Sequence, residues 1–126
     1  MAALRLDAAM ERSGGRYRAG TTRSECDASC RPRPRRAVAA SALVGHDGHR
    51  GWVYYVAVDP DRRQKGHGRA IMDAAEDWLR LAGIAKLQLL VRSDNAKVQA
   101  FYESIGYDEQ ERIVYAKWLD GREPTP

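Results

Sequence analysis

Long apolar runs are missing from this 126-residue chain. The apolar stretches of the first 40 residues are broken by charged side chains, and no segment approaches the roughly 20 apolar residues that a membrane-spanning helix needs. The length predicts one domain, and the broken N-terminal stretches are not typical of a secretory signal. We therefore expect a cytoplasmic protein without a membrane partner.

Cysteine is scarce, since the chain holds only Cys26 and Cys30, in a C-x3-C arrangement. A metal site needs two further ligands at suitable spacing, and the nearest histidines, His46 and His49, lie beyond a predicted strand. Two cysteines without a secretory signal favour a reducing compartment. We expect free thiols and no bound metal.

Lysine is absent from the first 36 residues, where nine arginines and four acidic residues give a net charge of about +5. The remainder carries about −1, so the whole excess of +4 is N-terminal. An arginine arm can bind nucleic acid, but this one has little aromatic interleaving and no helical or strand period. A segment of this composition cannot bury enough apolar surface to offset ordering. Residues 1–36 are predicted to be disordered, and a nucleic-acid partner is not favoured.

A strand, a glycine loop and a helix are predicted in the middle of the chain. Residues Trp52 to Val58 are rich in valine and tyrosine and too short for a free-standing helix, which indicates a largely buried strand. The turn Asp59-Pro60-Asp61 ends it. Apolar residues then recur at the three- and four-residue spacing of a helix packed on a sheet: Ile71, Ala74, Ala75, Trp78, Leu79 and Ala82.

The loop between this strand and the helix has the chemistry of a phosphate site. Gly66 and Gly68 lack Cβ atoms, so the backbone of residues 64–69 can curl and bring its amides close to a ligand. Amides at the start of a helix lack internal partners and lie at the positive end of its dipole. Four cationic residues add charge around the loop: Arg62, Arg63, Lys65 and Arg69. The sequence predicts a phosphate or pyrophosphate ligand.

Two familiar phosphate loops do not fit. A P-loop needs Lys-Ser/Thr after its second glycine, where this chain has Arg69-Ala70, and a dinucleotide fingerprint needs a small residue at Ile71. The pattern Arg63-x-x-Gly66-x-Gly68, preceded by Val56-Ala57-Val58-Asp59-Pro60, resembles the acetyl-coenzyme A signature of the GNAT superfamily of N-acetyltransferases. The resemblance continues through the predicted strand Leu87 to Val91, then Asn95, Tyr102 and Gly106-Tyr107, and covers Val38 to Trp118.

This resemblance implies an α/β fold with a mixed central sheet and flanking helices. The GNAT-like acetyl-coenzyme A-binding domain would span residues 37–120, with strands at 37–44, 52–58, 87–91 and 112–118, and residues 121–126 would form a tail. Family members begin with a strand, two helices and a second strand, which residues 1–36 do not match. We expect that portion to be missing or degenerate, through a truncated, fused or out-of-frame start.

The resemblance also implies the reaction. Acetyl-coenzyme A would give its acetyl group to a primary amine, of a small molecule or of a protein or peptide, by direct attack. Tyr102 would be the general acid that protonates the departing thiolate, and the amide near Val56 would stabilise the oxyanion. The predicted cofactor contacts are Val56, Val58, Arg63, Gln64, Lys65, Gly66, His67, Gly68, Arg69, Asn95 and Tyr102.

Several assignments stay open. The central strand contains no acidic residue to act as general base; His49 is one candidate, and Asp47, His46 and Tyr54 lie nearby. Asn95 can contact the pantetheine or cap the following helix, and Tyr102 can be an acid or a packing residue. Two other functions compete with the enzyme: a non-catalytic acyl-coenzyme A-binding module, and a nucleic-acid binder with a basic arm.

Overall fold

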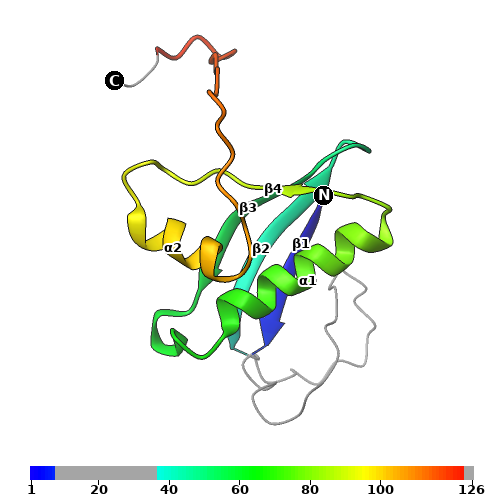
Figure 1. Ribbon diagram of the computed structural model, residues 1–126, viewed down its shortest axis with the longest axis vertical. Coiled ribbons are helices and arrows are strands. Elements are labelled where there is room, and N and C mark those ends of the chain that lie inside the picture. Colours follow the sequence, from blue (N-terminus) through cyan, green and yellow to red (C-terminus); the bar gives the residue numbers. More distant parts are fainter. Residues whose placement is uncertain (8–36, 124–126) are drawn as a thin grey trace, which may run out of the picture. The chain divides into compact units, whose positions relative to one another are not determined.

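A computed structural model of the chain describes residues 1–7 and 37–123 (Figure 1). These residues form two compact units, Met1–Leu90 and Val91–Pro126, and each is described by itself. The first unit contains the strands β1 (Ala2–Asp7), β2 (Val38–His46), β3 (Gly51–Val58) and β4 (Leu87–Gln88), the 3-10 helix η2 (Pro60–Arg62) and the helix α1 (His67–Leu81). The second contains the helix α2 (Ala96–Ser104).

The four strands form one mixed sheet in the order β1-β2-β3-β4. The pairs β1–β2 and β2–β3 are antiparallel, whereas β3–β4 is parallel. A parallel pair needs a crossover connection, and α1 provides it between β3 and β4 (Figure 1). The mixed α/β class and the strand–loop–helix order predicted from the sequence are confirmed.

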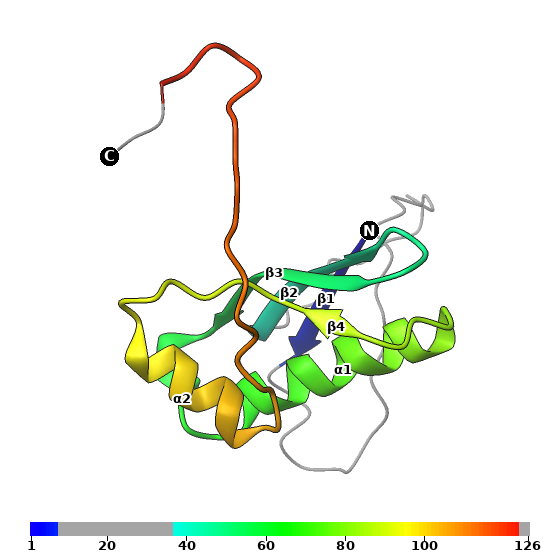
Figure 2. The ribbon, with the colours of Figure 1, turned by 45° about the horizontal axis from the view of Figure 1, so that its top comes forward.

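The core of the first unit lies between one face of the sheet and α1. Both ribbon views show α1 running along β1, β2 and β3 on that face (Figure 2). The residues buried there alternate along the strands and recur on one side of the helix: Leu4, Leu6, Ala40, Ala42, Val44, Val53, Ile71, Met72, Ala74, Ala75 and Leu79. At Gly51 a Cβ atom would collide with Leu79, lying 2.8 Å from its Cδ2 atom. Glycine therefore lets the start of β3 approach α1 closely.

A tight turn joins β2 to β3, as predicted. The Asp47 Oδ1 atom accepts hydrogen bonds from the amides of Arg50 and His49, each at 2.8 Å. These two donors lower the pKa of the Asp47 carboxyl below its ordinary value. Gly48 adopts a φ of 89°, the left-handed conformation that glycine tolerates without strain.

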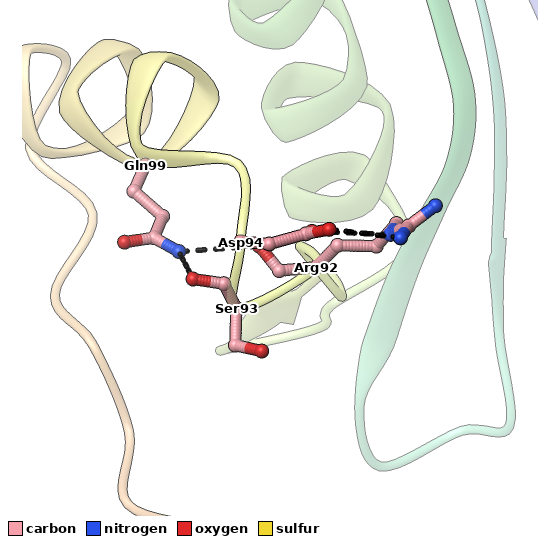
Figure 3. A network of polar contacts seen from close by, with 4 residues as sticks. All are labelled: Arg92, Ser93, Asp94 and Gln99. Carbon is pink, nitrogen blue, oxygen red and sulfur yellow. Dashed lines mark hydrogen bonds and ion pairs between the residues drawn. The ribbon is translucent and has the colours of Figure 1, made fainter.

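The second unit starts with a short loop that is hydrogen-bonded to α2. Arg92 forms a two-pronged ion pair with Asp94, at 2.9 and 3.2 Å. The Gln99 side-chain amide donates to the carbonyls of Arg92 and Ser93, at 3.1 and 3.0 Å (Figure 3). These contacts hold the loop immediately before the helix, so that the next residue, Asn95, lies at the helix N-cap.

The start of the chain is more ordered than its composition suggested. We expected disorder over residues 1–36, but Ala2–Asp7 forms β1 and pairs with β2. Leu4 and Leu6 are buried while Arg5 between them is exposed, which is the alternation of a half-buried strand. The average composition of the arginine-rich segment obscured this short pattern. Cys26 and Cys30 lie outside the described residues.

Two predicted strands differ from the structure. The strand expected at 87–91 is reduced to Leu87–Gln88, and the strand expected at 112–118 is absent, since no strand follows Gln88 among the described residues. The apolar side chains of that last segment are exposed: Ile113, Val114, Tyr115, Trp118 and Leu119. Alternation describes which way side chains point, but a strand also requires a ladder partner, and this segment has none among residues 37–123.

In the part of the chain that the structure describes, no helix combines the length and apolarity needed to cross a bilayer. Within residues 1–7 and 37–123, no three metal-binding side chains gather into a cluster that could hold an ion.

Candidate functional site

The loop that leads from β3 into α1 is curled, as its glycines predicted. Asp59 accepts a hydrogen bond from the Asp61 amide at 3.0 Å and caps η2. Gln64 and Gly66 then both adopt left-handed backbone angles, with φ of 64° and 79°. A Cβ atom at Gly66 would meet no heavy atom of the described residues within 4 Å, so the space on this side of the loop is open. The curl leaves room for a ligand beside the backbone.

Gly66 is the N-cap of α1. The first hydrogen bond of the helix runs from the Ala70 amide to the Gly66 carbonyl, at 3.0 Å. The amides of His67, Gly68 and Arg69 therefore precede the helical ladder, at the end of the helix where the dipole favours an anion. No acidic residue occurs in the first turn. This is the arrangement that a phosphate requires.

The cationic residues around the loop divide into two kinds. Arg62 forms an ion pair with Asp59 at 3.0 Å, so a carboxylate of the protein offsets part of the charge that the sequence suggested for the loop. Arg63 and Arg69 are exposed, and neither has an ion-pair partner among residues 37–123. Lys65 is also exposed. A phosphate ligand would thus find the exposed guanidinium groups of Arg63 and Arg69 at the loop.

A β-bulge interrupts β3 shortly before the loop. Ser41 pairs with Ala57 and Leu43 pairs with Tyr54, so that Tyr55 and Val56 together lie opposite a single residue of β2. Tyr55 has a φ of 51°, which is unusual for a residue with a side chain. Such strain costs about 1–3 kcal/mol and concentrates at functional sites. The special conformation of Tyr55 was not predicted from the sequence, because a tyrosine within a strand carries no signal of a bulge.

The second half of β3 has an unpaired edge within the described part of the first unit. The parallel pairing with β4 covers only Gly51 and Trp52. At the far end of β3 the Asp59 amide donates to Ala39 of β2 at 2.8 Å. Because successive backbone groups point to opposite edges of a strand, the amide of Val58 points away from β2. Val58 therefore presents its amide at the edge that β4 leaves open, and Val56 lies in the bulge next to it.

Asn95 and Tyr102 belong to the second unit. The Asn95 Oδ1 atom accepts a hydrogen bond from the Val98 amide at 3.3 Å, so its capping role is realised. Tyr102 is half-buried and makes edge-to-face contacts with Phe101 and Tyr107, with ring centroids 5.1 and 5.7 Å apart. Burial raises the pKa of the Tyr102 phenol above its ordinary value of 10.0.

The end of α2 helps to fix Tyr102. Gly106 follows the helix with a φ of 94°, and the Tyr107 amide donates to the Tyr102 carbonyl at 3.0 Å. This is the Schellman arrangement that ends many helices, and it confirms the predicted stop at Gly106. The ring of Tyr107 is thereby brought against Tyr102, so that the phenol is held on two sides by aromatic contacts.

His49, the residue predicted as a candidate general base, belongs to the turn between β2 and β3. It is exposed in the turn before β3, and it precedes Val56 by seven residues, most of them in β3. At the rise of a strand this corresponds to roughly 20 Å. His46 and Asp47 lie in the same turn, and His46 contacts the Trp78 ring, with centroids 5.6 Å apart. This separation along the chain does not favour His49 as the base of a reaction at Val56, and the assignment stays a prediction.

Comparison with known proteins identifies the family of this chain. The model of the acetyltransferase (GNAT) family matches residues 28–107. An acetyltransferase of Yersinia enterocolitica is 40% identical over 83 residues, which cover 66% of this chain and 59% of that protein. An acetyltransferase of Sodalis glossinidius is 39% identical over 77 residues, covering 61% and 54%. The chain thus spans less than two thirds of the length of these curated relatives.

Solved structures share the fold. The aminoglycoside N-acetyltransferase AAC(6')-Iy, in complex with a bisubstrate analogue, matches with a TM-score of 0.59 and 17% identity, over 68% of this chain and 65% of that one. An acetyltransferase of Trypanosoma brucei matches with a TM-score of 0.53 and 24% identity, over 69% and 64%. The family model covers well over half of the sequence, including β3, the glycine loop and both helices. The chain therefore belongs to the GNAT acetyltransferase family.

Proposed function

We propose that this chain binds acetyl-coenzyme A and transfers its acetyl group to a primary amine. The observation that carries the proposal is the loop between β3 and α1. Its backbone curls at Gln64 and Gly66 beside open space, and it leads into the amides that begin α1. Arg63 and Arg69 would add charge-assisted hydrogen bonds to the diphosphate of the cofactor. The remaining loop contacts are those expected from the sequence, Lys65, His67 and Gly68.

The pantetheine arm would lie along the open edge of β3. Amide groups of a ligand can pair with an exposed strand edge in the manner of an added strand, and Val58, with Val56 in the bulge next to it, offers such an edge. The bulge at Tyr55 changes the direction of the backbone just there. Asn95 would add a side-chain hydrogen bond to the same arm, beside its capping role.

The reaction would proceed without a covalent enzyme intermediate. A neutral amine attacks the thioester carbonyl, so that a C–N bond forms and negative charge develops on the carbonyl oxygen. The Val56 amide would stabilise that charge, a contribution of about 2.7–4 kcal/mol in comparable oxyanion holes. The C–S bond then breaks, Tyr102 gives its proton to the thiolate of coenzyme A, and the nitrogen loses a proton to solvent. The raised pKa of Tyr102 keeps the phenol protonated for this role at neutral pH.

Relatives of the family support the choice of an amine acceptor. The neighbour AAC(6')-Iy is named as an aminoglycoside N-acetyltransferase, and its complexes contain coenzyme A or a bisubstrate analogue. For this chain the acceptor is a small-molecule amine or an amine of a protein or peptide. The protein would act in the cytoplasm, where acetyl-coenzyme A is produced and cysteines stay reduced.

Release of free coenzyme A thiol tests the proposal. The full chain is incubated with acetyl-coenzyme A and a panel of amines and peptide N-termini, and thiol is measured over time. We expect amine-dependent release that falls at least tenfold in Tyr102→Phe, with little change in cofactor affinity. Tyr115→Phe is the matched control, since Tyr115 is 91% exposed in the C-terminal segment.

Two results would count against the proposal. Equal turnover in Tyr102→Phe and the wild type would remove Tyr102 from the chemistry. Saturable binding of acetyl-coenzyme A without release for any amine would instead support a non-catalytic acyl-coenzyme A-binding module.

A further inference from the structure

Two aromatic side chains stack on the face of the sheet that α1 does not cover. The rings of Trp52 and Tyr54 lie nearly parallel, with centroids 6.4 Å apart and an angle of 16°. Val53 between them is buried toward α1, so the alternation of β3 directs Trp52 and Tyr54 to the opposite face. Tyr54 is 37% exposed, and Trp52 is partly exposed. The stacked pair therefore offers ring surface to an incoming molecule.

The chemistry around this pair favours an uncharged aromatic group over a polycation. Neither β2 nor β3 contains an acidic residue. Arg5 of β1 pairs with Ser41 and lies, exposed, on the same face as Tyr54, because both are on the opposite side from the buried residues of their strands. A polycationic acceptor requires carboxylates to offset its charge, and β2 and β3, which carry and flank the aromatic pair, supply none.

The position of the pair relates it to the proposed reaction centre. Tyr54 precedes Val56 by two residues, so the two lie at most about 7 Å apart, and the bulge at Tyr55 between them can only shorten that separation. An amine that reached a thioester beside Val56 could therefore place a substituent on Tyr54 through a linker of only a few bonds. Trp52, one step further along the same face, would extend that contact surface.

We infer that Trp52 and Tyr54 determine acceptor specificity and select amines that carry an aromatic ring a few bonds from the reacting nitrogen. This inference rests on the proposed function, because it assigns the substrate class of the same site. Ring-on-ring contacts of this kind contribute binding beyond simple burial of area. An acceptor with an aliphatic group of equal size would lose this additional ring-on-ring contribution but keep the apolar contact. A polyamine would lose the apolar contact as well.

The test compares three acceptors with the full chain and acetyl-coenzyme A. Phenethylamine carries the ring, 2-cyclohexylethylamine has a similar size without a π system, and spermidine is a polycation. We expect kcat/KM to be highest for phenethylamine and lowest for spermidine. The preference for phenethylamine over 2-cyclohexylethylamine should fall roughly 2- to 12-fold in Trp52→Leu and in Tyr54→Leu, the range that one aromatic contact gives.

The controls separate specificity from folding and from activity. The aliphatic amine reports any general damage in each variant, and Tyr115→Leu should leave the preference unchanged because Tyr115 lies in the C-terminal segment of the second unit. A wild-type preference for spermidine, or a ring preference that survives both substitutions, would overturn the inference while leaving acetyl transfer intact. Absence of transfer to any amine would overturn the proposed function and the inference together.

Discussion

Gly66 gives the sharpest test of the phosphate loop, because an equivalent glycine stands at the other end of the same helix. Gly66 has a φ of 79° and Gly83 a φ of 76°, and at both positions an added Cβ atom would meet none of the surrounding heavy atoms within 4 Å. Alanine at either position should therefore cost the same backbone strain, about 1–2 kcal/mol. For a domain of this size, that corresponds to a fall of roughly 4–8 °C in Tm for each kcal/mol.

The two substitutions should differ only in ligand binding. At Gly66 the new methyl group occupies space beside the loop amides, where it would push a phosphate away from at least one of them. A hydrogen bond to a charged group is worth about 1.5–3 kcal/mol, so the Kd for acetyl-coenzyme A should rise roughly 10- to 150-fold. At Gly83 the Kd should stay within about twofold of the wild type, since that residue follows the C-terminal end of α1.

Calorimetric titration and thermal melting on both variants provide the measurement. Matched losses of Tm show that the strain is comparable, and the ratio of the two Kd values then isolates the contact with the ligand. If Gly66→Ala melts like Gly83→Ala and binds acetyl-coenzyme A like the wild type, the loop amides do not hold the diphosphate.

Three further outcomes are expected. Because burial raises the pKa of the Tyr102 phenol, the stability that the buried phenol contributes is complete below pH 10 and is lost as the pH rises further. Denaturant titrations between pH 9 and 12 should therefore show a smaller fall in the free energy of unfolding for Tyr102→Phe than for the wild type. Identical falls in the two proteins would refute this expectation. Gly51→Ala should lower the free energy of unfolding by about 1–3 kcal/mol, since its methyl group must displace the buried Leu79. An unchanged free energy in urea unfolding would show that the Leu79 side chain can move aside without cost. Asn95→Ala should lower the free energy of unfolding by about 1 kcal/mol, because the cap on the Val98 amide is lost. If the Kd for acetyl-coenzyme A rises in Asn95→Ala but not in Asn95→Asp, Asn95 has a second role besides capping.

The parts of the site that the sequence predicted are those governed by local chemistry. Gly66 had to be glycine-like because the chain turns left-handed there, and the helix after it follows from its apolar spacing. The stop at Gly106 and the turn at Gly48 have the same local origin. Residues within a few positions of one another decide such features, so the sequence states them directly.

The parts that were missed depend on partners far away in the chain. The bulge at Tyr55 exists because Ser41 pairs with Ala57 while Leu43 pairs with Tyr54, and strand alternation alone cannot reveal that offset. The predicted strand at 112–118 has the right alternation but no ladder partner among the described residues. The β1 strand was overlooked for the opposite reason, since its partner β2 orders a short pattern inside an arginine-rich segment.

Arg62 illustrates how a charge can be misread. In the sequence it is one of four cations around the glycine loop, whereas the structure pairs it with Asp59, three residues earlier. The same Asp59 ends β3 and caps η2, so one carboxylate both shapes the loop and offsets part of its positive charge. Composition counts charges, but only the fold decides which of them reach a ligand.

Isothermal titration of acetyl-coenzyme A into the folded full chain tests the central claim most directly. The account predicts saturable binding of one molecule per chain, weakened by added pyrophosphate because both ligands compete for the loop at Gly66. A folded protein that produces no saturable heat with acetyl-coenzyme A would contradict it.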